Sequence, residues 1–313
     1  MNASTRRLAA HAACMFAFVV STSVLVPAPA ALALESRIDA ARGEREGAND
    51  YNGALRDFLF NPQPRIILGA VAAPGSNPWQ AALLVSRIAN PGAAHYCGAS
   101  IYNDRWVVTA AHCLRNLEPL DVHVVAGETK LAHGVHRINA RRFIIHSDYS
   151  AASKDNDVGL VELFEPLTLS ATMTAVAPLT PDEESATVVN GQTLAKISGW
   201  GATTEGGKGA SELREAEAPF VSREACNDLL SYDGAVSDNM LCAGQAAAAG
   251  ADACQGDSGG PMTVVLANGE RRLAGVVSWG EGCGRPGKYG VYARVSRYKT
   301  WIEACVAGQA GCQ

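Results

Sequence analysis

Short extended segments separated by turn residues run through most of this 313-residue chain, and they restrict its fold more than any other feature. The segments are rich in Val, Ile and Leu and are bounded by Gly, Pro, Asn or Asp, a pattern typical of strands in β-sandwiches and β-barrels. The expected strands are Gln80–Ser86, Trp106–Ala110, Val122–Ala126, Arg142–His146, Val158–Leu163, Thr193–Ser198, Met262–Leu266, Arg272–Ser278 and Gly290–Val295. Apolar residues at helical spacing predict a single helix near residues 296–307. The sequence therefore predicts an all-β protein with a C-terminal helix.

The nine cysteines point to an oxidising compartment. Cys14 lies in an N-terminal apolar segment, and the other eight are spread over residues 97–312 without a C-x-x-C pair or a Cys/His cluster of zinc spacing. An even number of cysteines in such an arrangement favours four disulfides.

The first 65 residues differ in composition from the rest of the chain. Arg6 and Arg7 precede an apolar run over residues 12–26, and the small-residue stretch A-P-A-A-L-A follows at 28–33, which predicts a signal peptide over 1–33. A membrane anchor is the alternative, although the run is shorter than the ~20 residues that a spanning helix needs. Residues 34–65 combine five arginines with six acidic residues and end in N-P-Q-P-R, which indicates a pro-segment or a linker.

Three polar motifs lie at the ends of expected strands. They are T-A-A-H-C at 109–113, D-N-D-V at 155–158 and G-D-S-G-G-P at 256–261. Each motif alone is weak, because single histidines and turn aspartates are most often structural. Together they supply a nucleophile, a base and an acid that orients the base, which is the set that acyl transfer requires.

In these motifs and their order the chain resembles the trypsin/chymotrypsin family of serine endopeptidases, the best-known example of this chemistry. The stretches S-W-G at 278–280 and K-Y-G-V-Y at 288–292 also match, and the resemblance extends from Ile66 to about Val306. It implies two packed, antiparallel, six-stranded β-barrels, the first over about 66–180 and the second over about 181–296, followed by the helix.

The resemblance also implies a role for each motif residue. Ser258 would be the nucleophile, His112 the general base and then acid, and Asp157 the group that orients the imidazole. The backbone amides of Gly256 and Ser258 would form the oxyanion hole, and Ser278 would donate a hydrogen bond to Asp157. No metal and no cofactor is expected, because the chemistry needs only side chains and amides. The loop after Gly127 carries one acidic residue, too few for a calcium site of the kind found in this family.

By resemblance, Asp257 and Arg65 belong to an activation mechanism. Cleavage after Arg65 would create an α-ammonium at Ile66, and this group would pair with the buried carboxylate of Asp257. Removing one partner of a buried ion pair costs about 3–5 kcal/mol, so the uncleaved chain should be an inactive zymogen. Self-cleavage and cleavage by another protease are both consistent with an arginine at this position.

The position of Asp252, six residues before Ser258, resembles the floor of the primary specificity pocket, with Gly280 and Gly287 as its walls. A carboxylate there favours substrates with Arg or Lys before the scissile bond. Ala253 replaces a serine that often helps to bind lysine, so we expect arginine to be preferred, because its guanidinium pairs with a carboxylate through two hydrogen bonds.

The family pattern pairs Cys97 with Cys113, Cys226 with Cys242, and Cys254 with Cys283. The remaining pair, Cys305 and Cys312, is expected to pin the C-terminal tail.

The sequence thus predicts a secreted, extracellular or periplasmic, monomeric endopeptidase without a membrane association once the leader is removed. Its partners would be protein substrates and protein inhibitors, and the net charge of −5 gives no indication of nucleic-acid binding. Two other readings remain open. One is a catalytically silent binding protein on the same fold. The other is a lipase-type esterase, which usually has G-x-S-x-G before a helix and its histidine last in the sequence.

Overall fold

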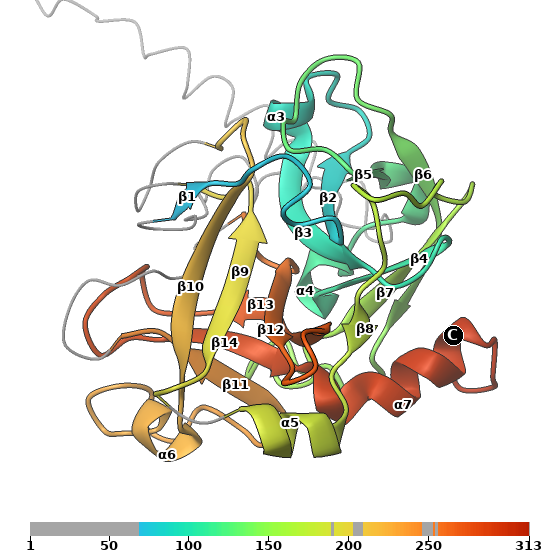
Figure 1. The fold of residues 1–313 in the computed structure, drawn as a ribbon. Coiled ribbons are helices and arrows are strands. Elements are labelled where there is room, and N and C mark those ends of the chain that lie inside the picture. The colour runs from blue at the N-terminus through green and yellow to red at the C-terminus, as the bar shows by residue number, and fades with distance from the viewer. Residues whose placement is uncertain (1–68, 189–190, 203–208, 246–252, 254–255, 313) are drawn as a thin grey trace, which may run out of the picture. The chain divides into compact units, whose positions relative to one another are not determined.

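Two antiparallel β-barrels make up the fold in the computed structural model (Figure 1). The structure describes residues 69–188, 191–202, 209–245, 253 and 256–312, and all of them belong to one compact unit. The expectations for the signal peptide and the pro-segment fall on residues 1–68 and so lie outside the described part of the chain. The predicted fold class is confirmed.

The first barrel closes in the order β2-β3-β4-β7-β6-β5. Its strands are β2 (Gln80–Val85), β3 (His95–Ile101), β4 (Trp106–Thr109), β5 (Val122–Ala126), β6 (Ile138–Ile145) and β7 (Gly159–Leu163). Short helices lie between them: α3 (Pro91–Ala94), α4 (Ala111–Leu114) and the 3-10 helix η1 (Pro119–Asp121). The barrel interior is filled by aliphatic side chains such as those of Leu83, Val107 and Leu160, which are inaccessible to solvent.

The second barrel closes in the order β9-β10-β11-β14-β13-β12, with β9 returning to β10. Its strands are β9 (Leu194–Gly199), β10 (Arg214–Val221), β11 (Met240–Ala243), β12 (Pro261–Val265), β13 (Arg271–Trp279) and β14 (Gly290–Arg294). Two short strands extend this sheet: β1 (Ala70–Val71) pairs with β10, and β8 (Ala177–Pro178) runs parallel to β13. The remaining helices are α5 (Pro181–Thr187), α6 (Arg223–Cys226) and α7 (Val295–Val306).

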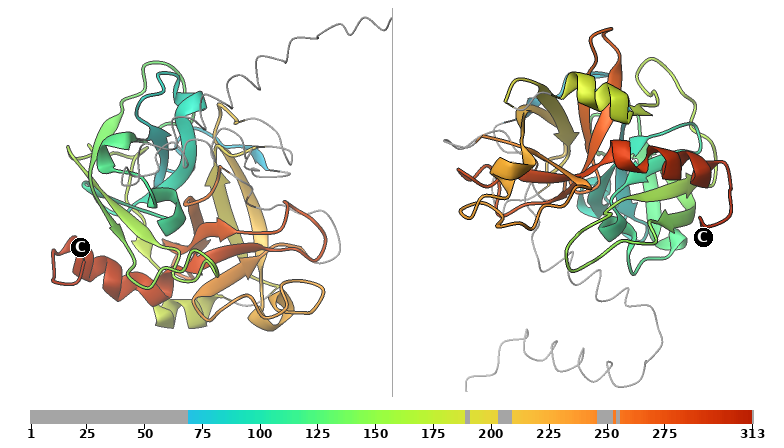
Figure 2. Two further views of the ribbon diagram at one scale, coloured as in Figure 1. Left: turned by 180° about the vertical axis from the view of Figure 1, so that it is seen from behind. Right: turned by 90° about the horizontal axis from the view of Figure 1, so that it is seen from below.

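The C-terminal helix α7 packs against a core to which both barrels contribute. Its buried residues Tyr298, Ile302 and Cys305 belong to the same apolar core as Val107 and Leu160. The helix begins and ends one residue before its predicted bounds. Helices α5 and α7 lie side by side in each view that shows both (Figures 1 and 2).

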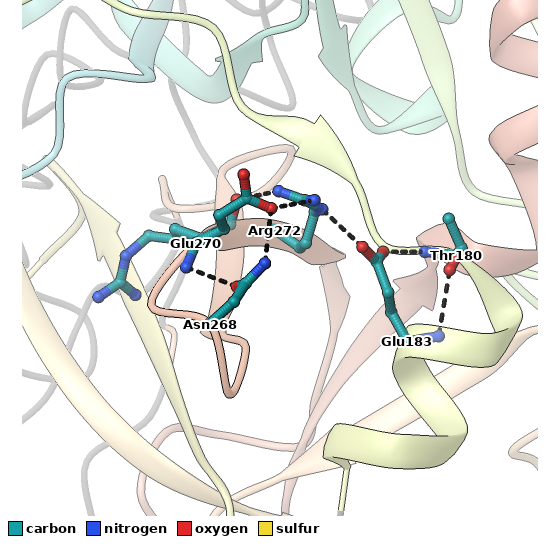
Figure 3. Close-up of polar contacts among 6 residues, drawn as sticks. Thr180, Glu183, Asn268, Glu270 and Arg272 are labelled. Atoms are coloured by element: carbon teal, nitrogen blue, oxygen red, sulfur yellow. Dashed lines mark hydrogen bonds and ion pairs between the residues drawn. The ribbon is translucent and has the colours of Figure 1, made fainter.

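Polar contacts fasten α5 to the second barrel. The Arg272 guanidinium lies between two carboxylates, with 3.0 Å from Nε to Glu183 and 2.6 Å from Nη2 to Glu270 (Figure 3). Glu183 also accepts the backbone N–H of Thr180, and the Thr180 hydroxyl accepts the backbone N–H of Glu183, so the pair caps the helix. The next residue, Glu184, is buried and binds the Arg294 guanidinium and the Ser296 hydroxyl at the start of α7.

Candidate active site

The pairing of β4 with β7 brings His112 and Asp157 together. The last residue of β4, Thr109, lies opposite the first residue of β7, Gly159, in this antiparallel pair. Residues that follow Thr109 and residues that precede Gly159 therefore leave the barrel at the same end. His112 is the second residue of α4, which starts two residues after Thr109, and Asp157 lies two residues before Gly159.

The carboxylate of Asp157 accepts hydrogen bonds from both barrels. His112 Nδ1 lies 2.7 Å from Oδ2, and the backbone N–H of His112 donates to Oδ1 over 2.9 Å. From β13 of the second barrel, the Ser278 hydroxyl donates to Oδ2 over 2.5 Å. Because an ionised carboxylate only accepts hydrogen bonds, the imidazole carries a proton on Nδ1 and leaves Nε2 for another partner.

Opposing effects act on the pKa of Asp157, which is 1% exposed. Burial alone raises this pKa, because it disfavours the charged form. The charge of His112 and the hydrogen bonds from the imidazole, from Ser278 and from the His112 backbone outweigh burial and lower the pKa below its ordinary value of 3.8. The group is therefore a carboxylate at neutral pH, held in place by three donors.

Backbone hydrogen bonds to β3 and β13 place the segment that contains Ser258 close to His112 and Asp157. The carbonyl of Ser258 accepts the N–H of Gly98 on β3 over 2.7 Å, and the N–H of Gly259 donates to Val277 on β13 over 2.8 Å. Gly259 has a φ of +78°, and a Cβ on it would lie 2.2 Å from Thr109 Oγ1. Only glycine fits there, so the turn before β12 lies directly against the strand end that precedes His112.

Asp257 is fully buried beside two glycines, Gly199 at the end of β9 and Gly201 just after it. Its Oδ1 accepts the N–H of Gly201 over 3.0 Å, and a Cβ on Gly199 or Gly201 would lie 2.0 or 2.4 Å from a carboxylate oxygen. The sequence analysis did not identify these glycines. The S-G-W-G stretch at 198–201, with two glycines around a buried tryptophan, was the available signal.

The expected pocket and activation residues are described only in part. Asp252, Cys254, Arg65 and Ile66 lie outside the described residues. Gly256 has a φ of +91°, which favours glycine. A Cβ on Gly280 would approach the carbonyl of Tyr289 at 3.5 Å, whereas a Cβ on Gly287 would meet no atom within 4 Å. Gly287 has a φ of +71°, which favours glycine, and the place of both glycines in a pocket wall stays a prediction.

Disulfides join three of the four expected cysteine pairs. They are Cys97–Cys113, Cys226–Cys242 and Cys305–Cys312. Cys283 is also disulfide-bonded, and its expected partner Cys254 is outside the described residues. Cys97, His112 and Cys113 present ligand atoms within 4.8 Å of one another, but the two sulfurs are bonded to each other and offer no thiolate for a metal.

Two six-stranded barrels, with a histidine–aspartate pair on the first that accepts a hydrogen bond from the second, define the class of chymotrypsin-like double-barrel proteins. Within that class the chain belongs to the trypsin family of serine proteases, because the sequence profile of the family described as Trypsin matches residues 66–302. It is 35% identical over 265 residues to "Transmembrane protease serine 11G" of Rattus norvegicus, an alignment that covers 82% of this chain and 61% of the relative. The chain thus spans about three-fifths of the length of that relative. In the described residues, no helix has the length and apolar character needed to span a bilayer.

Proposed function

We propose that this chain is a secreted serine endopeptidase that cleaves after Arg or Lys and is made as a zymogen. The observation that carries the proposal is the Asp157 carboxylate, which orients the His112 imidazole while the turn containing Ser258 packs against the strand that leads to His112. Membership of a serine protease family supports the same conclusion.

In the proposed reaction, Ser258 Oγ attacks the carbonyl carbon of the scissile peptide bond. His112 Nε2 takes the hydroxyl proton and then gives it to the leaving amine, so that an acyl-enzyme remains. Water attacks this ester by the same route, with His112 again as the base. Asp157 stays ionised and stabilises the imidazolium. Its lowered pKa fits this role, because a protonated carboxyl would lose the attraction to a charged imidazole.

The negative charge that develops on the carbonyl oxygen needs donors that are already in position. The backbone amides of Gly256 and Ser258 are the proposed pair, and each such donor contributes about 3–4 kcal/mol to lowering the barrier. The positive φ of Gly256 supports this assignment, because it turns the chain sharply just before Ser258.

Asp252 is the proposed base of the substrate pocket, and Gly280 and Gly287 are its proposed walls. The specificity would be for Arg over Lys, because Ala253 supplies no hydroxyl to a lysine ammonium. The activation step would be cleavage after Arg65, by the enzyme itself or by another protease, followed by pairing of the Ile66 α-ammonium with Asp257. Burial of Asp257 supports this step, because a buried carboxylate needs charged or hydrogen-bonding partners.

The proposal of secretion rests on the leader over residues 1–33. The family membership supports two further proposals: the protein acts as a monomer, and it binds protein substrates and protein inhibitors. The relative from rat is called a transmembrane protease, so an uncleaved anchor is the alternative. N-terminal sequencing of the protein released into the medium or periplasm distinguishes the two, since a start at residue 34 requires removal of the leader.

The decisive experiment uses purified residues 34–313 before and after limited trypsin treatment, which is stopped with a macromolecular inhibitor shown beforehand not to block this protein. The new N-terminus is sequenced, and matched Arg, Lys and Phe chromogenic peptides are assayed, with Ser258→Ala as the control for residual trypsin. We expect a terminus at Ile66, turnover of Arg peptides only after cleavage, and labelling of Ser258 by an organophosphonate. Cleavage at Arg65 without turnover or labelling would favour the silent binding protein, and turnover of long-chain esters without peptide cleavage would favour the esterase.

A further inference from the structure

The loop that leads into Asp157 is fastened to the second barrel at a place separate from the Ser278 contact. Asp155 Oδ1 accepts a hydrogen bond of 2.6 Å from the Ser237 hydroxyl, and Asn239 Nδ2 lies 3.3 Å from both oxygens of the same carboxylate. Ser237 and Asn239 precede β11 and lie more than eighty residues further along the chain. The loop is thus tied to the second barrel by a charge-assisted hydrogen bond, one of the stronger kinds.

Asn156, next to Asp157, makes a second set of contacts. Its Oδ1 accepts from Asn239 Nδ2 and from the Tyr298 hydroxyl, each over 3.3 Å, and its Nδ2 donates to the carbonyl of Asp148 over 3.0 Å. Its φ of +55° lies in the left-handed region, where residues other than glycine and asparagine are strained. The side-chain contacts therefore hold an unusual backbone conformation directly before Asp157.

The partners of this loop are themselves anchored. Tyr298 is buried on α7, and its hydroxyl lies 3.4 Å from the carbonyl of Asn239. The same carbonyl accepts the N–H of Arg294 at the end of β14 over 2.9 Å. We call Asp155, Asn156, Asn239 and Tyr298 the inter-barrel clamp. It joins the loop of the first barrel to two elements of the second half of the chain.

We infer that the inter-barrel clamp sets the position of the Asp157 carboxylate, and that Asn156 and Asn239 are positioning residues for the reaction. The inference rests on the proposed function. The N–H of Val158 donates to the carbonyl of Asn156 over 2.8 Å, so the backbone closes tightly around Asp157 and transmits a shift of its neighbour. The three donors to Asp157 lie at 2.5–2.9 Å, and a displacement of about 1 Å would take them out of hydrogen-bond range.

The test compares Asn156→Gly, Asn239→Ala and Tyr298→Phe with the activated wild-type enzyme. Asn156→Gly is informative because glycine keeps the left-handed backbone and removes only the side-chain contacts. The matched control is Asn227→Ala. Asn227 binds the N–H and the carbonyl of Val236, each over 2.8 Å, in the same disulfide-closed segment, and it has no contact with the clamp among the described interactions.

For Asn156→Gly and Asn239→Ala we expect kcat on an Arg peptide to fall by about tenfold to a hundredfold, with KM within about twofold, because misplacing a group that acts in the transition state affects kcat. The fall for Tyr298→Phe should be smaller, since the other contacts of Asn156 remain. The acidic limb of the pH profile should move to lower pH, because a displaced carboxylate stabilises the imidazolium less. Asn227→Ala should keep kcat and the pH profile.

A second readout separates this inference from the proposed function. The low-field proton resonance of the His112 Nδ1–H···Asp157 hydrogen bond reports the position of the carboxylate whether or not the protein turns over substrate. We expect the resonance to shift or broaden in Asn156→Gly and Asn239→Ala and to persist in Asn227→Ala. If the wild type has the resonance but no activity, the proposed function fails while loss of the resonance in the clamp variants still supports the clamp. If the clamp variants keep both kcat and the resonance, the inference is wrong.

Discussion

Replacing Gly199 by alanine should disable the protein by displacing Asp257. The added Cβ would lie 2.0 Å from Asp257 Oδ1, whereas an ordinary contact is 3.4 Å or more, so the carboxylate or the strand must move by about 1.4 Å in a tightly packed interior. The carboxylate accepts a hydrogen bond from the backbone N–H of Gly201, and such a movement would break or lengthen this bond. The backbone of Gly199 has no positive φ, so the effect comes from space alone.

Two costs add to give the magnitude. Overpacking a close-packed site costs about 1–3 kcal/mol, and losing a hydrogen bond to a buried carboxylate costs about 1.5–3 kcal/mol. We therefore expect the free energy of unfolding to fall by about 2.5–6 kcal/mol. Because Asp257 is the neighbour of Ser258, the same displacement should lower kcat/KM on an Arg peptide by about a hundredfold.

Thermal unfolding of the purified variant measures the first effect, and the rate on an Arg peptide after activation, divided by the titrated concentration of active sites, measures the second. Gly92→Ala is the matched control, since its Cβ would be 3.5 Å from the nearest atom, the carbonyl oxygen of Leu131. It should unfold and react like the wild type. A Gly199→Ala protein with wild-type stability and more than half of the wild-type kcat/KM would refute the argument that Asp257 has no room to move.

Three further predictions concern single side chains. Ser278→Ala removes one of three donors from Asp157, so the pKa of that carboxyl should rise and kcat/KM should fall by about tenfold; an unchanged rate would show that the donors from His112 suffice. Burial lowers the pKa of His146 and of His123 below 6.5, so the unfolded chain takes up protons first and the free energy of unfolding should fall as the pH drops below about 6.5. His146→Phe should reduce that slope by up to about 1.4 kcal/mol per pH unit in a denaturation series, and an equal slope would contradict the assignment. Glu184→Gln should lower the free energy of unfolding by about 3 kcal/mol by breaking a buried ion pair, and a loss below about 1 kcal/mol in urea unfolding would contradict it.

Strands with alternating large aliphatic residues were predictable from the sequence. The predicted range Val122–Ala126 coincides with β5, and most of the other expected strands differ from the observed ones by one or two residues. β6 differs more, because it begins four residues before the expected Arg142, at Ile138. Its first half alternates buried Ile138 and Ala140 with exposed polar residues, a signal too weak to mark the start.

The two longest strands that the sequence analysis missed, β10 and β3, carry residues that ordinarily disfavour strands. β10 reads R-E-A-E-A-P-F-V, in which the buried positions are alanines before Phe220, and Pro219 lacks the N–H that strand pairing uses. β3 contains a glycine and two polar residues. Barrel closure overrides these local preferences, since neighbouring strands on both sides supply the hydrogen bonds and the buried surface.

Within the candidate site, the pairing of His112 with Asp157 follows from motifs that a single sequence reveals. The clamp and the contacts of Gly199 and Gly201 with Asp257 do not. Their residues are an aspartate, asparagines, a tyrosine and glycines, which are common in loops and are brought together only by the fold. The place of Gly287 in a pocket wall stays a prediction, because Asp252, the expected base of that pocket, lies outside the described residues.

The position of α7 makes the folding of the first half of the chain depend on its last residues. The apolar core that contains Val107 and Leu160 also contains side chains from the last helix, so a chain emerging from the ribosome cannot complete this core until its final residues have arrived. A fragment that ends before residue 295 would expose an apolar face where Tyr298 and Ile302 belong. The strands of the first barrel all lie within residues 80–163, but the apolar core around them is complete only in chains that include α7.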